Sequence, residues 1–157
     1  MIPMSIRLCS VFTVVSLWVV AGCSGQKLPE GMPKLTPVVL TVTMDGAPLD
    51  GATVGLIPLD PANSRWNAGG VTDQSGKAKI RTLAQYDGAA AGKYKVTVTK
   101  TYIEPSPEGQ TYEEFRKTKR PPPVEFVHKK FAVQSSTPLD LEVGSTAVDQ
   151  TFEVKKP

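Results

Sequence analysis

Residues 38–59 read VVLTVTMDGAPLDGATVGLIPL, and this stretch decides the fold class. From Val38 to Met44 apolar side chains occupy every second position, which is the period of a β-strand with one buried face. Asp45-Gly46 follows at once and indicates a tight turn, because glycine accepts the positive φ that such a reversal needs. A second strand is therefore predicted from Gly51 to Leu59.

Short alternating runs recur along the rest of the chain. Residues 77–82 read KAKIRT and predict a strand with one buried face and one solvated basic face. Residues 92–99 give the most regular alternation, and residues 139–143 and 148–154 add two further strands. About seven strands of this kind, in a chain with 14 prolines and 13 glycines, predict an all-β sandwich.

Residues 104–123 interrupt this pattern. They show no alternation, and acidic residues are followed by a basic run and three prolines. A 20-residue excursion is unusual in a compact domain and is often functional or disordered. We expect a long charged loop at 104–123, after which residues 124–133 rejoin the sheet.

The amino-terminal residues indicate where the protein resides. An apolar run from Leu8 to Val20 ends at Val20-Ala21-Gly22-Cys23, which resembles a bacterial lipoprotein signal cut between Gly22 and Cys23. The alternative, an uncleaved transmembrane helix, needs about 20 apolar residues, and this run is shorter and contains polar side chains. Residues 1–22 are predicted to be a signal peptide, and Cys23 is predicted to carry palmitate-type acyl chains.

Cleavage leaves Cys23 as the single cysteine, because Cys9 departs with the leader, so no disulfide within the chain is expected. Residues 23–37 then hold the acylated cysteine and a proline- and glycine-containing stretch that predicts a flexible tether. Residues 38–157 make one domain of ordinary size. Ser24, rather than an aspartate, follows the cysteine, and this resembles lipoproteins sent to the outer membrane of the cell envelope.

The net charge of the chain limits which kinds of partner are expected. The chain has 157 residues with 18 basic and 15 acidic side chains, and the loss of Arg7 with the leader leaves 17 against 15. So small an excess, scattered through the chain, does not favour nucleic acid. The expected partners are a membrane, through the acyl chains on Cys23, and an envelope protein or glycan.

Three segments resemble the carboxypeptidase regulatory-like, transthyretin-like domain, and they are DGAPLDGATV at 45–54, VTDQSGKA at 71–78 and AGKYKVTV at 91–98. The resemblance covers roughly residues 38–100. Ser136-Thr137-Pro138-Leu139 is similar to a segment of planctomycete lipoproteins that carry this domain. The resemblance implies a Greek-key β-sandwich that serves as a non-catalytic binding, stabilising or spacer module. A fold alone does not fix a function.

The residue inventory gives catalysis little support. His128 is the only histidine, whereas the transthyretin-like hydrolases depend on histidines and on a characteristic C-terminal tail that FEVKKP at 152–157 does not match. A hydrolase is the weaker alternative, and His128 is expected to be an exposed residue at a strand end. One histidine and one acylated cysteine do not complete a zinc shell, so no metal or other cofactor is expected. Calcium held by several loops is the remaining metal alternative.

Two sets of side chains are candidates for binding. Aromatic residues expected in loops or at strand ends would stack on a sugar if they gathered at one end of the sandwich, and they are Trp66, Tyr86, Tyr102 and Tyr112. Basic residues of the long loop would contact an anionic surface or another envelope protein, and they are Arg116, Lys117, Lys119 and Arg120. The alternatives are that each aromatic ring packs over its own loop and that the basic cluster is solvated.

Overall fold

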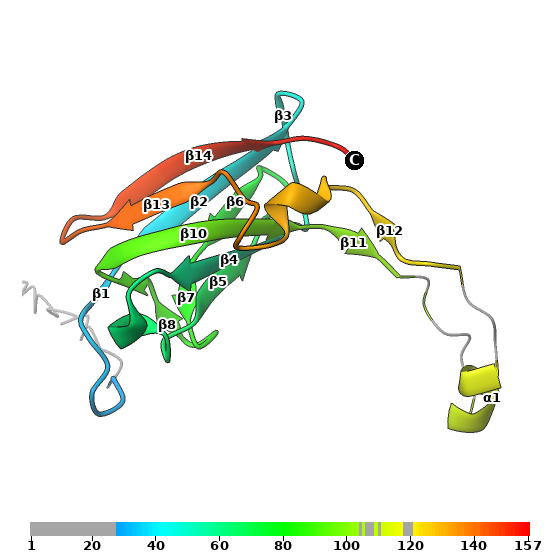
Figure 1. Cartoon of the computed structure of the whole chain (residues 1–157), viewed down its shortest axis with the longest axis horizontal. Helices are drawn as coiled ribbons and strands as arrows, with labels where there is room; N and C mark the ends of the chain where they lie inside the picture. Colours follow the sequence, from blue (N-terminus) through cyan, green and yellow to red (C-terminus); the bar gives the residue numbers. More distant parts are fainter. Residues whose placement is uncertain (1–27, 104, 106–108, 110, 118–120) are drawn as a thin grey trace, which may run out of the picture.

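The computed structural model describes residues 28–103, 105, 109, 111–117 and 121–157, and these form an all-β sandwich (Figure 1). The large sheet has the strand order β13 (Asp140–Val143), β10 (Gly92–Thr99), β4 (Thr53–Pro58), β5 (Ala68–Val71), β7 (Arg81–Thr82) and β8 (Tyr86–Asp87). The small sheet contains β14 (Val148–Val154), β2 (Val38–Met44) and β3 (Ala47–Pro48), with β6 (Lys77–Lys79) also paired to β2. The predicted sandwich is confirmed.

The chain passes between the two sheets in a Greek-key arrangement. β4 pairs with β5 and β5 with β7, while β6, which continues into β7, pairs with β2 and so returns beside the first long strand. The β6–β7 run changes sheets at Ile80. β14 lies parallel to β2, from Val148 beside Val38 to Val154 beside Met44. The last strand of the sandwich therefore pairs with the first.

Alternating side chains fill the space between the sheets. The inward residues of β2, β4, β10 and β14 are at most 6% exposed, and they are Val38, Leu40, Val42, Val54, Leu56, Tyr94, Val96, Val98, Phe152 and Val154. Burial of one such aliphatic side chain stabilises the fold by about 1.5–3 kcal/mol. The periodicity that predicted the strands is thus the pattern of core packing.

The residues within the tight turns determine the geometry of those turns. Asp45 and Gly46 take φ values of 52° and 78°, so the predicted Asp-Gly turn joins β2 to β3. In the loop from β5 to β6, Asp73 Oδ1 accepts the amide protons of Ser75 and Lys77 at N···O distances of 2.8 and 3.0 Å. The two aspartates are therefore turn-forming residues, as their sequence context predicts.

Four of the described threonines are buried, and each donates its hydroxyl proton to a backbone carbonyl. The Oγ1···O distances are 2.6 to 2.8 Å for the pairs Thr36 with Gly144, Thr72 with Leu49, Thr82 with Gly88 and Thr137 with Val96. A buried hydroxyl without a partner would cost about 1–3 kcal/mol. Thr137 belongs to the Ser-Thr-Pro-Leu segment, so that motif fastens the chain to β10.

The sheet structure begins earlier than predicted. β1 (Leu35–Thr36) pairs with β9 (Ala89–Ala90), so residues expected in the tether form part of the sandwich edge. The second predicted strand begins at Thr53 rather than Gly51, because Gly51 has a φ of 64° and lies in the turn before β4.

Residues 124–133 do not rejoin the sheet as one strand, which corrects that prediction. Only β12 (Val124–Glu125) pairs, with β11 (Thr101–Tyr102), and Phe131 then enters the core from the 3-10 turn Lys129–Phe131. β11 and β12 form a ribbon that projects from the sandwich and carries α1 (Tyr112–Lys117) (Figure 1). We call β11, α1 and β12 the arm.

The helix in the arm was not predicted, and a capping box accounts for it. The amide of Thr111 donates to Glu114 Oε2 at 2.9 Å, and the amide of Glu114 donates to Thr111 Oγ1 at 3.4 Å. These reciprocal bonds satisfy two backbone donors at the start of the helix. The Thr-x-x-Glu spacing was therefore a usable sequence signature for α1.

Candidate functional site

Trp66 is not an exposed platform for a sugar. The residue is 7% exposed, and the guanidinium carbon of Arg65 lies 4.7 Å from the centroid of its ring. The amide of Trp66 donates to the carbonyl of Asn63 at 2.9 Å, directly after the 3-10 turn Pro61–Asn63. The burial of Trp66 therefore does not favour the accessible stacking role for which it was a candidate.

The other aromatic candidates lie far apart. Tyr86 is on β8, at the edge of the large sheet, and Tyr102 is on β11, where the arm leaves the sandwich (Figure 1). Tyr112 begins α1 at the end of the arm. The strands and helix that carry these residues lie apart, so they do not form the single end of the sandwich that stacking on a shared sugar would require.

The predicted basic cluster falls partly on α1. Arg116 and Lys117 are exposed in its last turn, where positive charge favours the carboxyl end of a helix. Lys119 and Arg120 lie outside the described residues. The pKa of Glu114 is lowered because the backbone amide and the hydroxyl of Thr111 donate hydrogen bonds to its carboxylate. The described part of the arm therefore carries mixed charge.

The base of the arm exposes large apolar side chains. Tyr102 is 55% exposed, Ile103 65% and Val124 53%, and Phe126 beside them is 39% exposed. The inward faces of the sandwich strands bury side chains of this size, whereas the two-stranded ribbon has no second layer above it. Tyr102 and Val124 lie opposite each other in the ribbon, and exposed apolar patches are typical of protein contact sites.

His128 has a structural partner. It is exposed, as predicted, but it caps the 3-10 turn Lys129–Phe131 instead of ending a strand. Its Nδ1 accepts the amide proton of Lys130 at 3.1 Å. Ser136 Oγ donates to the carbonyl of Lys130 at 2.9 Å, so this nearby hydroxyl is bonded to backbone and not to the imidazole.

Two statements on metals and membranes hold for the described part of the chain. It contains no group of three or more histidine, cysteine, aspartate or glutamate side chains placed to hold a metal ion. It also contains no helix long and apolar enough to cross a bilayer. The predicted signal peptide, Gly22 and Cys23 lie outside the described residues.

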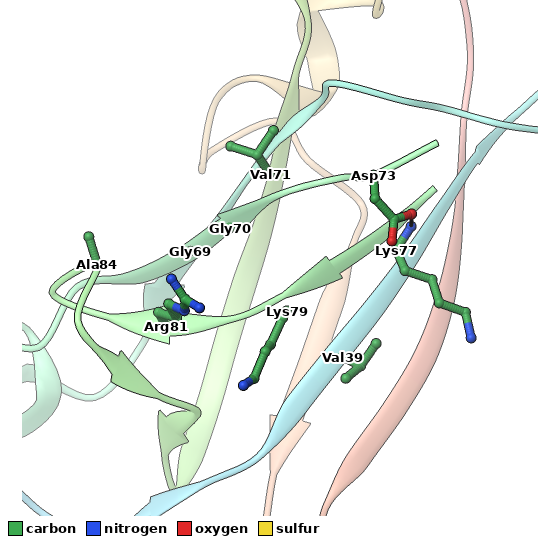
Figure 2. A pocket seen from close by; sticks show the side chains of 9 residues that line it. All are labelled: Val39, Gly69, Gly70, Val71, Asp73, Lys77, Lys79, Arg81 and Ala84. Atoms are coloured by element: carbon green, nitrogen blue, oxygen red, sulfur yellow. Dashed lines mark hydrogen bonds between the residues drawn. The ribbon is translucent and has the colours of Figure 1, made fainter. Parts of the chain in front are cut away.

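A basic groove runs beside the β6–β7 run (Figure 2). Its volume is about 530 Å³, and it is lined by Val39, Gly69, Gly70, Val71, Asp73, Lys77, Lys79, Arg81 and Ala84. Lys77, Lys79 and Arg81 face outward because Ala78, Ile80 and Thr82, which alternate with them, are fully buried. The solvated basic face predicted from KAKIRT is confirmed, and the structure adds a hollow beside it.

Asp87 on β8 orients two of the three cations. Its Oδ2 lies 2.5 Å from Lys79 Nζ and its Oδ1 lies 3.2 Å from Arg81 Nε. The pKa of Asp87 is lowered, chiefly by the hydrogen bond from Lys79. The pKa of Asp73 is also lowered, first by the hydroxyl of Ser75 and then by the amide of Lys77. Both carboxylates are therefore charged at neutral pH, and they leave the groove with a small positive excess.

Two glycines of β5 line the groove, and a side chain at either position would clash with backbone. A Cβ at Gly69 would lie 2.7 Å from the carbonyl oxygen of Val54, and a Cβ at Gly70 would lie 2.6 Å from that of Lys79. Side chains are thus excluded from the stretch of β5 beside the three cations. The basic residues were visible in the sequence, but their position next to these glycines depends on strand pairing between β5 and β7.

No family model and no curated protein matches the chain. Among solved structures, the chain is similar to a variant of the major pilin subunit of Bacillus cereus, with 18% identity, a TM-score of 0.46, and coverage of 80% of this chain and 31% of the pilin. It is also similar to a 9R-lipoxygenase from Cyanothece, with 16% identity, a TM-score of 0.39, and coverage of 82% of this chain and 18% of the lipoxygenase. At these scores neither neighbour bears on what this chain does.

Proposed function

We propose that the protein is a lipid-anchored, non-catalytic β-sandwich module of the cell envelope, held to the membrane by acyl chains on Cys23. The lipoprotein-type sequence Val20-Ala21-Gly22-Cys23 supports the anchor. Among the described residues the first one paired in a sheet is Leu35, and the residues between it and Cys23 would span less than about 35 Å, because the amide of Met32 donates to the carbonyl of Pro29 in a turn. The sandwich would then stand clear of the lipid surface.

The proposal that the module is non-catalytic rests on the hydrogen bonds that its polar side chains make to the backbone. The four buried threonines all bond backbone carbonyls, and the hydroxyl of Tyr94 donates to the carbonyl of Ala90 at 2.7 Å. His128 caps a turn. A nucleophile needs a neighbouring base within hydrogen-bond reach, and these groups are instead placed to hold connections. The arrangement supports a module that binds or spaces rather than reacts.

Metabolic labelling with palmitate tests the anchor. The wild-type chain is expected to take up label and to have the mass of a protein that starts at acylated Cys23. Cys23→Ser should lose the label and keep its leader. Cys9→Ser is the matched control, because it removes the other cysteine, which lies within the leader, and it should label normally. Label on Cys23→Ser, or a wild-type chain with an intact leader, would overturn the anchor.

Substitutions of Ser24 test which membrane carries the protein. We propose the outer membrane, on the resemblance of Cys23-Ser24 to lipoproteins sent there. Ser24→Asp should move the labelled protein toward the inner-membrane fraction, whereas Ser24→Ala should leave it in place. Equal distribution of the two variants contradicts the proposal.

Contact with another envelope protein through the arm is a second candidate function. The exposed apolar side chains at the base of the arm, such as Tyr102 and Val124, favour it. A photo-cross-linking residue at Ile103 should trap a protein partner in intact cells, and the same residue at Thr97, on the sandwich, is the control. Equal yields at both positions would remove this candidate.

A further inference from the structure

The three cations of the basic groove follow one another along the chain. Lys77, Lys79 and Arg81 occupy every second position of the β6–β7 run, and all are exposed. Lys77 and Lys79 lie on β6, where strand geometry spaces their backbones by about 6.6 Å, and Arg81 follows on β7 after the run changes sheets at Ile80. Several cations beside one groove suit a ligand that carries several anionic groups.

The cations retain binding capacity despite Asp87. Arg81 contacts Asp87 through Nε, and its two terminal nitrogens make no hydrogen bond among the described residues. Lys77 has no ion pair in that part of the chain, because Asp73 Oδ1 accepts from Ser75 and from the amide of Lys77 instead. Asp87 therefore holds Lys79 and Arg81 in position while leaving the planar edge of the guanidinium open to an anion.

The remaining walls of the groove are apolar or bare backbone. Val71 is 62% exposed, Val39 lies on the neighbouring β2, and the backbone of β5 at Gly69 and Gly70 completes this part of the lining (Figure 2). Cations beside an apolar surface match a sugar chain, whose rings have apolar faces and whose acidic groups lie along its edge.

We propose that the basic groove binds a linear acidic glycan, with its anionic groups along Lys77, Lys79 and Arg81. The inference deepens the binding role proposed above by naming its ligand class. A single exposed ion contact is weak, so measurable affinity requires several anionic groups on one chain. A hollow beside several cations favours a narrow polymer over the flat surface of a bilayer.

Oligogalacturonate, which has a carboxylate on every sugar, is the probe. Binding is measured with the full-length chain in neutral detergent, at low and at physiological ionic strength. Wild-type protein is expected to bind, with affinity that falls as salt rises. The triple variant Lys77→Gln, Lys79→Gln and Arg81→Gln should bind about tenfold more weakly. Its thermal unfolding should match that of the wild type, because all three side chains are on the surface.

The matched control removes three charges elsewhere. Lys93→Gln, Lys129→Gln and Lys155→Gln alter exposed lysines that have no ion pair among the described residues, and this variant should bind as the wild type does. Equal losses in the two triple variants, or no binding by the wild type, would overturn the proposal. Binding to anionic lipid vesicles without binding to the glycan would also overturn it.

The test of glycan binding and the test of the lipid anchor can fail independently of each other. Palmitate labelling reports only on Cys23, and the groove lies on the sandwich. A chain that binds the glycan but takes up no label would remove the anchor and keep the groove. A labelled chain that ignores the glycan would do the reverse.

Discussion

The sandwich and the arm are both built from paired strands, but only the sandwich places a second layer over them. On β2, Val38, Leu40 and Val42 are at most 1% exposed, whereas Tyr102 and Val124 on the arm are more than half exposed. An isolated two-stranded ribbon is marginally stable in water. The difference indicates that backbone pairing positions a strand, while burial of its side chains supplies most of its stability.

The largest difference between the two regions should appear when one large aliphatic side chain in each is shortened to alanine. Leu40→Ala deletes a fully buried group at the centre of the small sheet and should lower the free energy of unfolding by about 2–5 kcal/mol. Ile103→Ala, beside the arm ribbon, should change it by no more than about 0.5 kcal/mol. Urea unfolding of both variants checks this, and comparable losses would mean that the arm belongs to the cooperative core.

A second contrast concerns hydroxyl groups. Thr137→Val should destabilise the sandwich by about 1–3 kcal/mol, because the carbonyl of Val96 loses its donor in a buried site. Thr137→Ser keeps the hydroxyl and should recover most of this loss. In the arm, Thr111→Val removes the cap of α1 but should leave global unfolding unchanged. An unaltered midpoint for Thr137→Val would show that the hydroxyl does not fasten the segment.

The turn between β7 and β8 is a place where the sandwich tolerates strain. Leu83 and Ala84 both have positive φ, 52° and 60°, a region that L-residues with a Cβ adopt at a cost. Ala84→Gly should therefore raise the free energy of unfolding by about 1 kcal/mol. Ala132→Gly is the control, because Ala132 has a φ of −82° and glycine there should be slightly destabilising. Thermal unfolding separates the two outcomes.

The same contrast explains which parts of the fold were predictable from the sequence. β2, β10 and β14 carry a period of two that follows directly from having one buried face, so their positions could be predicted. Asp45-Gly46 could be predicted because the requirement for positive φ is local. β1 could not be predicted, since Leu35 and Thr36 become a strand only through pairing with Ala89 and Ala90.

The candidate site divides in the same way. The outward direction of Lys77, Lys79 and Arg81 follows from their alternation with buried residues, and so the basic face was predictable. The groove was not, because Gly69 and Gly70 reach the three cations through tertiary pairing. Trp66 was a candidate for stacking because it is an aromatic residue expected in a loop, whereas the structure buries its ring and places Arg65 over it.

The smallest expected effects concern acid, and they compare one carboxylate from each region. The pKa values of Asp73, in the sandwich, and Glu114, in the arm, are both lowered by hydrogen bonds to their charged forms, from ordinary values of 3.8 and 4.5. A carboxyl group with a lowered pKa in the folded state stabilises the fold above its unfolded pKa. This contribution is lost as the pH falls through the folded value.

Between about pH 5 and pH 2 the sandwich should therefore lose stability as Asp73 is protonated, because its turn joins β5 to β6. Asp73→Asn should flatten the dependence of the urea midpoint on pH in this range. Glu114→Gln should leave that dependence unchanged, because Glu114 caps α1, which lies outside the layers that unfold together. Equal flattening in the two variants would mean that the arm unfolds cooperatively with the sandwich, and the distinction between a covered and an uncovered ribbon would no longer hold.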